Sequence, residues 1–154
     1  MQHQDGSSHL VAATIPNCKA YDPAFAGEMA VIVDHGMREM LVEQKDVFHN
    51  VTLVNENDAQ PDLPEGAAAG LIKGCYKFGS YPCSSDGGSG HDSLKEVTLL
   101  GSGTILTEVV KAAHLLAAQG VDVVDANAIV KAAQSRQAIT AQEVATLDDE
   151  ALAA

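Results

Sequence analysis

The sequence predicts an α/β fold made of portions of two parallel-sheet domains joined by a glycine-rich linker. In the first half, a long amphipathic helix pattern is followed by a β-branched run. In the second half, a strand, a helix and a strand succeed one another with short connections, which is typical of a βαβ unit and therefore of a parallel sheet. Between the halves, residues 80–93 read SYPCSSDGGSGHDS and have the small, polar composition of a flexible linker.

The first half begins with LVAATIP (10–16), a short β-rich run that ends in Pro16 and predicts a strand or extended segment. A helix is expected over residues 23–44, with Asp22 as its N-cap and Pro23 at its first position. One face of this helix is apolar: Phe25, Met29, Ile32, Met37, Met40 and Leu41. Charged residues are expected largely on the other faces: Glu28, Asp34, Arg38 and Glu39.

The run VFHNVTLVN (47–55) is β-branched and partly alternating, so it predicts a second strand. The polar, proline-bearing segment NENDAQPDLPEG that follows predicts a loop. The segment GAAAGLIKGCYKFG (66–79) predicts a helix that begins near Pro64 and Glu65, although its four glycines weaken it.

The second half opens with KEVTLLGSG (95–103), a predicted strand that ends in a glycine turn. A helix is expected over 104–119, followed by Gly120 at the position of a C-terminal glycine cap. Its apolar side comprises Ile105, Leu106, Val109, Val110, Ala113 and Leu116. VDVVDANA (121–128) predicts another strand, and AIVKAAQ (128–134) the start of another helix.

These elements predict four parts of the chain. Residues 1–79 form the end of one α/β domain, 80–93 the linker and 94–135 the start of a second domain. Residues 136–154 form an acidic, alanine-rich tail that we leave unassigned.

Charge and composition exclude several classes of function. The formal net charge of the 154 residues is −12, from 21 acidic and 9 basic residues, and this field repels nucleic acid. No apolar run reaches membrane-spanning length and no signal peptide is visible, so we expect neither a membrane partner nor export. The odd number of cysteines, without metal-ligand spacing, is typical of free, inert thiols in a reducing cytosol. We therefore expect a soluble cytoplasmic protein.

Two short motifs are candidates for binding. The GSG motif (101–103) stands between a strand and a helix N-terminus, where backbone amides can hold an anion, but tight-turn glycines without a ligand explain it as well. Asn55, Glu56 and Asn57 follow a predicted strand, where ligands of α/β proteins gather, although any loop needs polar residues. Neither motif identifies a ligand or a reaction.

The histidines divide into two groups. His35, His49 and His114 lie inside predicted helices or a strand, and we interpret them as structural. The first ten residues, MQHQDGSSHL, crowd His3 and His9 around an aspartate and a glycine. Such a segment is either a binding segment or a solvated chain terminus. No Ser-His-Asp arrangement and no paired-cysteine metal site can be argued, so we predict no metal-binding residue.

Several blocks in order resemble a known family: QHQDGSSH, TIPNCKAYDPAFAGEMAVIV, VTLVNEN, LPEGAAAGLIKGCYKF and LLGSGTIL. They are similar to the homodimeric, thiamine-diphosphate-dependent first (decarboxylating) component of the bacterial pyruvate dehydrogenase complex. That family typically reads Q-H-E-D-G-H-S-H, T-I-P-N-C, Y-D-P-A-[FY]-A-Y-E, N-E-N-Y, M-P-E-G and G-S-G-[ST]-I-L. The match covers about residues 2–120 and implies the end of a pyrimidine-binding domain and the start of a transketolase-like C-terminal domain.

The resemblance implies a function. Family members decarboxylate pyruvate on thiamine diphosphate and Mg²⁺, and then transfer the acetyl group to the lipoyl carrier of a partner acetyltransferase. His3 matches a family histidine that contacts the substrate-derived intermediate, and His9 matches the position of a substrate-facing histidine in related transketolases. Both are therefore predicted as catalytic residues that donate hydrogen bonds or protons to the intermediate.

The departures from the family pattern imply a limit. The blocks that hold the diphosphate and Mg²⁺, and the glutamate that activates the cofactor, have no counterpart here, so no cofactor-binding residue is predicted. Ser7, Gly27 and Asp58 replace a family histidine and two tyrosines, and residues 125–154 match nothing in the pattern. We therefore expect a fragment that is inactive alone and that depends on a second copy or on missing parts of the enzyme. The alternative is a non-catalytic α/β interaction module. Cut sheets and helix faces predict a poorly soluble or self-associating chain.

Overall fold

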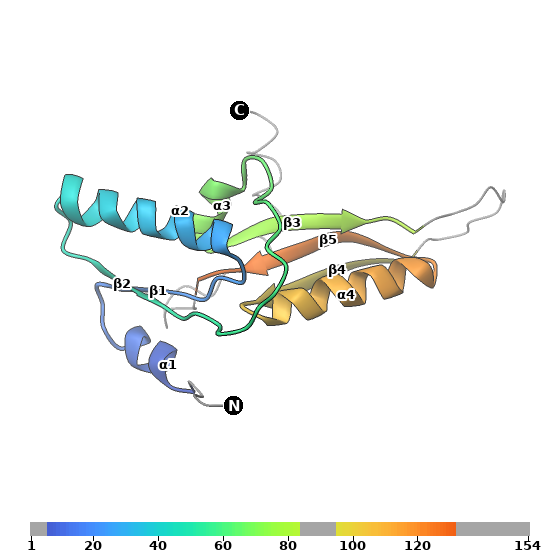
Figure 1. The fold of residues 1–154 in the computed structure, drawn as a ribbon, viewed down its shortest axis with the longest axis horizontal. Helices are drawn as coiled ribbons and strands as arrows, with labels where there is room; N and C mark the ends of the chain where they lie inside the picture. Colours follow the sequence, from blue (N-terminus) through green and yellow to red (C-terminus); the bar gives the residue numbers. More distant parts are fainter. Residues whose placement is uncertain (1–5, 84–94, 132–154) are drawn as a thin grey trace.

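A computed structural model describes residues 6–83 and 95–131 of the chain as a mixed α/β structure with two small sheets. A parallel two-stranded sheet joins β1 (Cys18–Tyr21) to β2 (Phe48–Val51). A mixed three-stranded sheet has the order β3-β5-β4, formed by Cys75–Tyr81, Val121–Ile129 and Lys95–Ser102. Helices α1 (Ser8–Ala13) and α2 (Ala26–Met37) lie on opposite sides of the parallel sheet (Figure 1).

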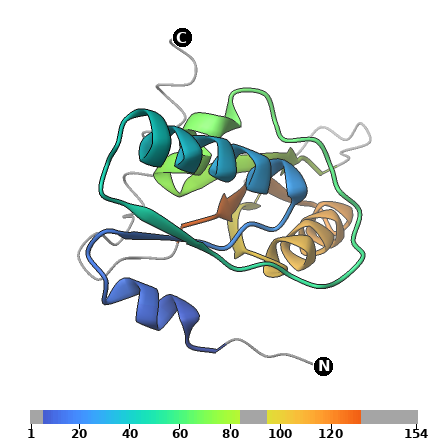
Figure 2. The same ribbon diagram turned by 60° about the vertical axis from the view of Figure 1, so that its left-hand side comes forward.

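Alternation along β1 explains why the two helices lie on either side of it. Cys18 and Ala20 point to one face, where Ala12 of α1 packs against them. Tyr21 points to the other face and packs in the core that contains Ile32 of α2. The view in Figure 2 shows α1 and α2 separated by this pair of strands.

The first segment differs from its prediction. Residues 10–16 were expected as a strand or extended segment, but Ser8–Ala13 forms the helix α1. Leu10 and Val11 remain exposed, and Ala12 alone is buried in this helix, so a short β-rich run was overruled by the packing of one small side chain on β1.

The long helix is confirmed, with two corrections. It begins after Phe25 rather than at Pro23, because the side chain of Glu28 accepts hydrogen bonds from the amides of Ala24 and Phe25 at 2.5 and 2.9 Å. Glu28 is therefore buried, 1% exposed, instead of lying on a solvent face, and it also accepts a 2.6 Å hydrogen bond from the Tyr76 hydroxyl.

The second correction concerns the far end of this helix, where a π-helical turn, η1 (Arg38–Val42), follows α2. The wider turn rotates the side chains away from the predicted apolar face. Glu39 is buried there, 3% exposed, whereas Met37 and Leu41 are 52% and 67% exposed. The predicted apolar face is thus correct for Phe25 and Ile32 and wrong from Met37, the last residue of α2, onward.

Residues 66–79 divide between two elements instead of forming one helix. Helix α3 covers Ala67–Lys73, and Gly74 ends it with a φ of 119°. The chain then enters β3 at Cys75 and pairs antiparallel with β5. The left-handed glycine explains the division, because it ends the helix and turns the chain.

The βαβ unit in the second half is confirmed. Helix α4 (Ile105–Ala118) connects β4 to β5, and these two strands are parallel. Gly120 follows the helix with a φ of 79°, as expected of a C-terminal cap. The predicted helical start at 128–134 is wrong for its first residues, because Ala128 and Ile129 belong to β5, and it lies outside the described residues from 132 on.

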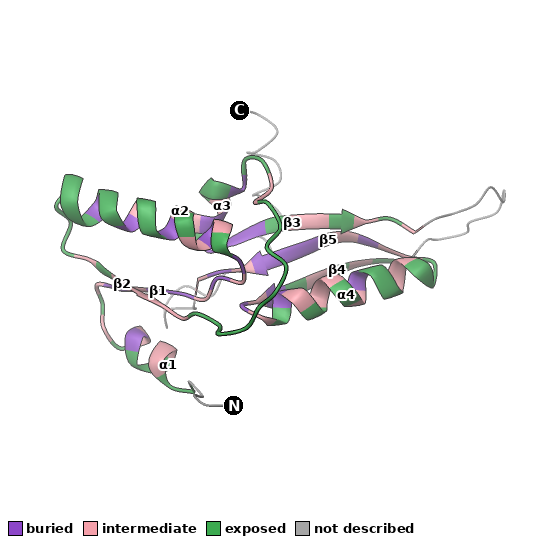
Figure 3. Cartoon of the chain, viewed as in Figure 1, coloured by how far each residue is buried: buried purple, intermediate pink, exposed green. Residues whose placement is uncertain are grey.

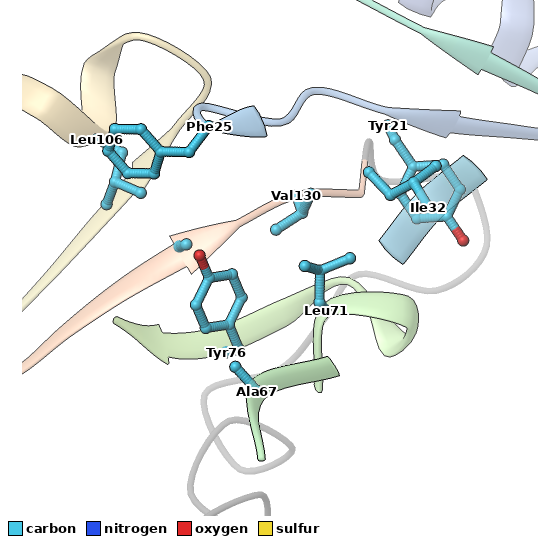
Figure 4. Close-up of a cluster of buried hydrophobic side chains, with 9 residues drawn as sticks. Tyr21, Phe25, Ile32, Ala67, Leu71, Tyr76, Leu106 and Val130 are labelled. Atoms are coloured by element: carbon cyan, nitrogen blue, oxygen red, sulfur yellow. The ribbon is translucent and has the colours of Figure 1, made fainter. Parts of the chain in front are cut away.

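The main core draws on both halves of the chain, and Figure 3 shows its buried positions where the two sheets and the helices meet. Figure 4 shows its side chains converging from the two sheets, α2, α3 and α4. They are Tyr21, Phe25, Ile32, Ala67, Leu71, Tyr76, Leu106, Ala128 and Val130. An isolated bridge between Tyr21 and Lys131 also links β1 to the chain that leaves β5.

The predicted linker lies largely outside the described residues. Its first two residues, Ser80 and Tyr81, belong to β3, and residues 84–93 are not described. The predicted tail, 136–154, is likewise outside the described part. β3 and β5 come from either side of the linker and pair in one sheet. The predicted division into two domains stays a prediction.

Candidate functional site

A hydrogen-bonded network connects the carboxyl ends of three strands. Asp22 directly follows β1, Thr52 directly follows β2, and Ser102 is the last residue of β4. The Thr52 hydroxyl donates to Asp22 Oδ1 at 2.6 Å, and the Ser102 hydroxyl donates to Asp22 Oδ2 at 2.8 Å. The ring nitrogen Nε2 of His9 lies 3.0 Å from Thr52 Oγ1. We call these four residues the Asp22 network.

His9 reaches this network from α1, and the structure leaves one of its ring nitrogens unused. Its Nε2 contacts Thr52, whereas its Nδ1 is buried and has no hydrogen-bond partner among the described residues. Buried polar atoms in folded proteins nearly always have partners, so such an atom is a candidate for ligand contact. His3, the other predicted catalytic residue, lies outside the described residues.

The GSG motif acts as a close-packed turn beside the network. Gly103 has a φ of 51°, and a Cβ there would lie 2.6 Å from Asp22 Oδ2. Its amide donates to the backbone oxygen of Asp22 at 3.2 Å. A Cβ on Gly101 would lie 2.9 Å from Leu106 Cα on α4. Gly103 thus lies in a tight turn, whereas Gly101 lies inside β4, where its lack of a side chain lets α4 pack closely.

A cleft of about 250 Å³ opens next to these strand ends. Its apolar wall comes from Phe25 and Met29 of the α2 region and from Leu53 and Val54 after β2, and Thr104 also lines it. Of the polar cluster that follows the strand, Glu56 lines the cleft, whereas Asn55 and Asn57 are exposed and are not part of its wall.

The electrostatics of this cleft disfavour an anion. The amides of Ala24 and Phe25 are taken by Glu28, and the amide of Ala26 donates to Gln60 Oε1 at 2.8 Å. The start of α2 therefore offers no free amide from these residues. Glu56 and Asp58 add two carboxylates to the lining, so the cleft suits an apolar group better than a phosphate.

A second polar group, the Glu39 cluster, lies near the amino ends of the same strands. Lys19 Nζ contacts both carboxylate oxygens of Glu39 at 2.7 Å, and Lys45 Nζ lies 3.2 Å from Oε1. The Nε2 atoms of His35 and His49 each lie 3.3 Å from Oε2. The cluster consists of these five residues.

The cluster perturbs the groups within it. Burial acts to raise the pKa of Glu39, but hydrogen bonds from Lys19 and Lys45 outweigh it and lower the pKa to about 2. Burial also lowers the pKa of His49, and the neighbouring Glu39 opposes this effect. Gly36 of α2 leaves room for the His49 ring, since a Cβ there would lie 2.8 Å from Nδ1. The structural interpretation of His35 and His49 fits this arrangement.

The remaining reactive side chains have ordinary surroundings. Cys18, Cys75 and Cys83 form no disulfide within the described residues, and burial raises the pKa of the Cys18 and Cys75 thiols. The ring of His114 packs edge-on against Tyr81, with the centroids 4.7 Å apart. Within residues 6–83 and 95–131, no group of three or more histidine, cysteine or acidic side chains is arranged to hold a metal ion. No helix in these ranges has the length and apolar character needed to cross a membrane.

The sequence pointed to His9 but not to its partners. Asp22 was interpreted as a helix cap and Thr52 as a strand residue, and Ser102 was noted only as part of the GSG motif. The structure places each at the carboxyl end of a strand, but no strand was predicted over Cys18–Tyr21 and the strand predicted at 47–55 runs past Thr52, so no signal in the sequence groups them.

Sequence comparisons find relatives of this chain. Residues 1–61 match the family described as the pyruvate dehydrogenase E1 component middle domain. The chain is 49% identical over 116 residues to the pyruvate dehydrogenase E1 component of Pseudomonas aeruginosa, and 46% identical over 118 residues to that of Escherichia coli. These alignments cover 75% and 76% of the chain but 12% of each relative.

A solved structure supports the fold independently. The chain is similar to a mutant transketolase from Pichia stipitis, solved in complex with fructose-6-phosphate, with a TM-score of 0.56. The similarity covers 89% of the chain and 18% of the transketolase at 17% sequence identity, so it concerns the fold alone.

Proposed function

The chain is homologous to part of the bacterial homodimeric pyruvate dehydrogenase E1 component, in its middle-domain region, and we propose that it supplies a wall of that enzyme's substrate channel. In the complete enzyme, thiamine diphosphate and Mg²⁺ would carry the decarboxylation of pyruvate, and the acetyl group would pass to the lipoyl carrier of the acetyltransferase partner. His3 and His9 would face the substrate-derived intermediate. The observation that supports this most is the buried Nδ1 of His9 at the carboxyl ends of the strands, which has no hydrogen-bond partner within residues 6–83 and 95–131.

The described residues do not fit the diphosphate end of the cofactor. The first amides of α2 are occupied by Glu28 and Gln60, and the adjacent cleft carries the carboxylates of Glu56 and Asp58. A Mg²⁺-diphosphate needs free amides or carboxylates arranged around the metal. The amides of Ala24, Phe25 and Ala26 are taken, and the described residues contain no such group of acidic side chains. We infer that the chain alone does not bind the cofactor and is inactive alone.

Two experiments test this proposal. Titration calorimetry of the 154-residue chain with thiamine diphosphate and Mg²⁺ should give no saturable heat. The second experiment replaces the aligned segment of the Escherichia coli enzyme with this sequence and measures pyruvate decarboxylation. The chimera should be active, and His9→Ala should reduce its kcat by roughly 100-fold or more, as expected for loss of an acid–base group.

The control for the chimera is His114→Ala, because His114 packs on Tyr81 away from the network. It should leave the activity of the chimera unchanged. A folded, dimeric chimera without activity, or an unchanged kcat in His9→Ala, would contradict the proposed role.

A non-catalytic interaction module is the second candidate, and one surface favours it. Val33, Met37 and Leu41 are spaced four residues apart along α2 and η1, and they are 42%, 52% and 67% exposed. If this stripe binds a second copy of the chain, Leu41→Glu should shift the sedimentation profile toward monomer. Leu115→Glu, on α4 and 66% exposed, is the matched control. Equal profiles for both variants would remove the support for this candidate.

A further inference from the structure

The Thr52 hydroxyl lies between a carboxylate and an imidazole, and its single proton decides the state of the imidazole. Its oxygen lies 2.6 Å from Asp22 Oδ1 and 3.0 Å from His9 Nε2. A hydroxyl donates one hydrogen bond and accepts others, whereas an ionised carboxylate accepts only. The proton of Thr52 therefore points to Asp22. The other acceptor in reach, the backbone oxygen of Tyr21, is more distant at 3.4 Å.

Further hydrogen bonds fix the orientation of the Asp22 carboxylate. Its second carboxylate oxygen accepts from Ser102 at 2.8 Å, so both oxygens are engaged. Its amide donates to the Val130 oxygen at 2.7 Å, and its own backbone oxygen accepts from the Gly103 amide. Contacts from the ends of β4 and β5 thus hold Asp22 in the orientation that takes the proton of Thr52.

If Thr52 donates to Asp22, it can only accept from His9. We propose that Asp22 and Thr52 are positioning residues that hold neutral His9 with its proton on Nε2, so that Nδ1 presents a lone pair to the ligand. This inference deepens the proposed function, since it assigns the atom of His9 that meets the substrate. The unpartnered Nδ1 is the atom that the tautomer leaves as an acceptor.

The tautomer defines the chemistry of the ligand that suits this site. In the neutral state, Nδ1 accepts a hydrogen bond or a proton from a hydroxyl or a carboxylic acid. After that proton arrives, the same Nδ1–H donates to the oxygen left behind. Nε2 keeps its proton, which stays hydrogen-bonded to Thr52, so only Nδ1 exchanges a proton with the ligand. The site therefore suits a ligand that presents a hydroxyl to Nδ1.

Nuclear magnetic resonance on the full 154-residue chain tests this assignment without any substrate. Proton–nitrogen correlation spectra at a pH where His9 is neutral report which nitrogen carries the proton, and exchange with water reports its protection. The His9 signals are assigned by their loss in His9→Gln. We expect a protected proton on Nε2 and none on Nδ1.

Two substitutions at one position separate the hydroxyl from the packing. Thr52→Val removes the acceptor and should accelerate exchange of the Nε2 proton with water by about tenfold or more. Thr52→Ser keeps the hydroxyl and should retain the protection. Asp22→Asn should also accelerate exchange, because Thr52 loses the carboxylate that holds its proton. Thr107→Val is the matched control, since the Thr107 hydroxyl donates to the oxygen of Thr104, the N-cap residue of α4.

The wild-type spectrum alone can overturn the proposal, even if a variant fails to fold. A protected proton on His9 Nδ1, or an Nε2 proton that exchanges as fast as that of an exposed ring, would do so. Unchanged protection in a folded Thr52→Val chain would do so as well. Because no cofactor or substrate enters the measurement, an inactive chimera in the test of the proposed function leaves this result independent.

Discussion

The Glu39 cluster and the Asp22 network both join β1 to β2, but at opposite ends of the strands. At the amino ends, two lysines and two histidines surround one carboxylate, and both of its oxygens have cationic partners. At the carboxyl ends, Asp22 is also satisfied, but the chain of hydrogen bonds ends at a buried imidazole nitrogen that has no partner in the described part of the chain. A fully compensated group stabilises a fold, whereas an incomplete one is available to a ligand. This difference, rather than the number of polar residues, distinguishes the candidate site.

The largest expected effect concerns the compensated end. Glu39→Gln removes the charge that four neighbours face, and we expect it to lower the free energy of unfolding by about 3 to 5 kcal/mol, as for other broken buried ion pairs. Urea denaturation followed by circular dichroism measures this. Glu43→Gln is the control, because its contact with Lys45 is exposed and should contribute less than about 0.5 kcal/mol. Equal effects of the two variants would show that the Glu39 cluster is not a stability element.

Low pH should remove the stabilisation that Glu39 provides at the amino ends of the strands. The pKa of Glu39 is lowered from 4.5 to about 2 in the folded chain, so its contribution is complete above pH 4.5 and is lost as the pH falls toward 2. We expect wild type to lose about 3 kcal/mol more than Glu39→Gln over this range. Unfolding free energies at a series of pH values measure the difference. Parallel curves for the two proteins would contradict the assignment.

The next effect tests how closely Gly103 packs against Asp22 in the Asp22 network. Gly103→Ala should cost about 2 kcal/mol, because the new Cβ meets Asp22 Oδ2 and the positive φ strains alanine. Gly120→Ala has a positive φ with open space around it, so it should cost about 1 kcal/mol. Thermal denaturation of both variants isolates the contact with Asp22. If Gly120→Ala is as costly as Gly103→Ala, that contact contributes nothing.

The smallest effect concerns the stability of the network itself. Thr52→Val removes one hydroxyl that contacts both Asp22 and His9, and it should cost about 1 kcal/mol in unfolding free energy. Thr107→Val, which removes a hydroxyl from the first turn of α4, serves as the reference. A loss near that of Glu39→Gln would erase the distinction between a structural cluster and a site.

Much of the fold could be predicted from local patterns. The β4-α4-β5 unit and the body of α2 followed from periodicity and from a glycine at the helix end, because these signals lie within a few residues. The prediction of a strand or extended segment at 10–16 was wrong because the helix at Ser8–Ala13 depends on one small residue that packs on β1. The prediction that Glu28 and Glu39 lie on the outer faces of the helix was wrong because partners from distant elements bury each of them.

The sequence by itself determined the α/β class, the family resemblance and the choice of His9, since these depend on residue order and local spacing. The tertiary structure alone decided the partners of His9. Asp22, Thr52 and Ser102 are separated by as many as 80 residues along the chain, and they meet because the carboxyl ends of their strands meet at one place. The tautomer of His9 follows from that meeting, because a proton's position depends on the neighbours that fold around it.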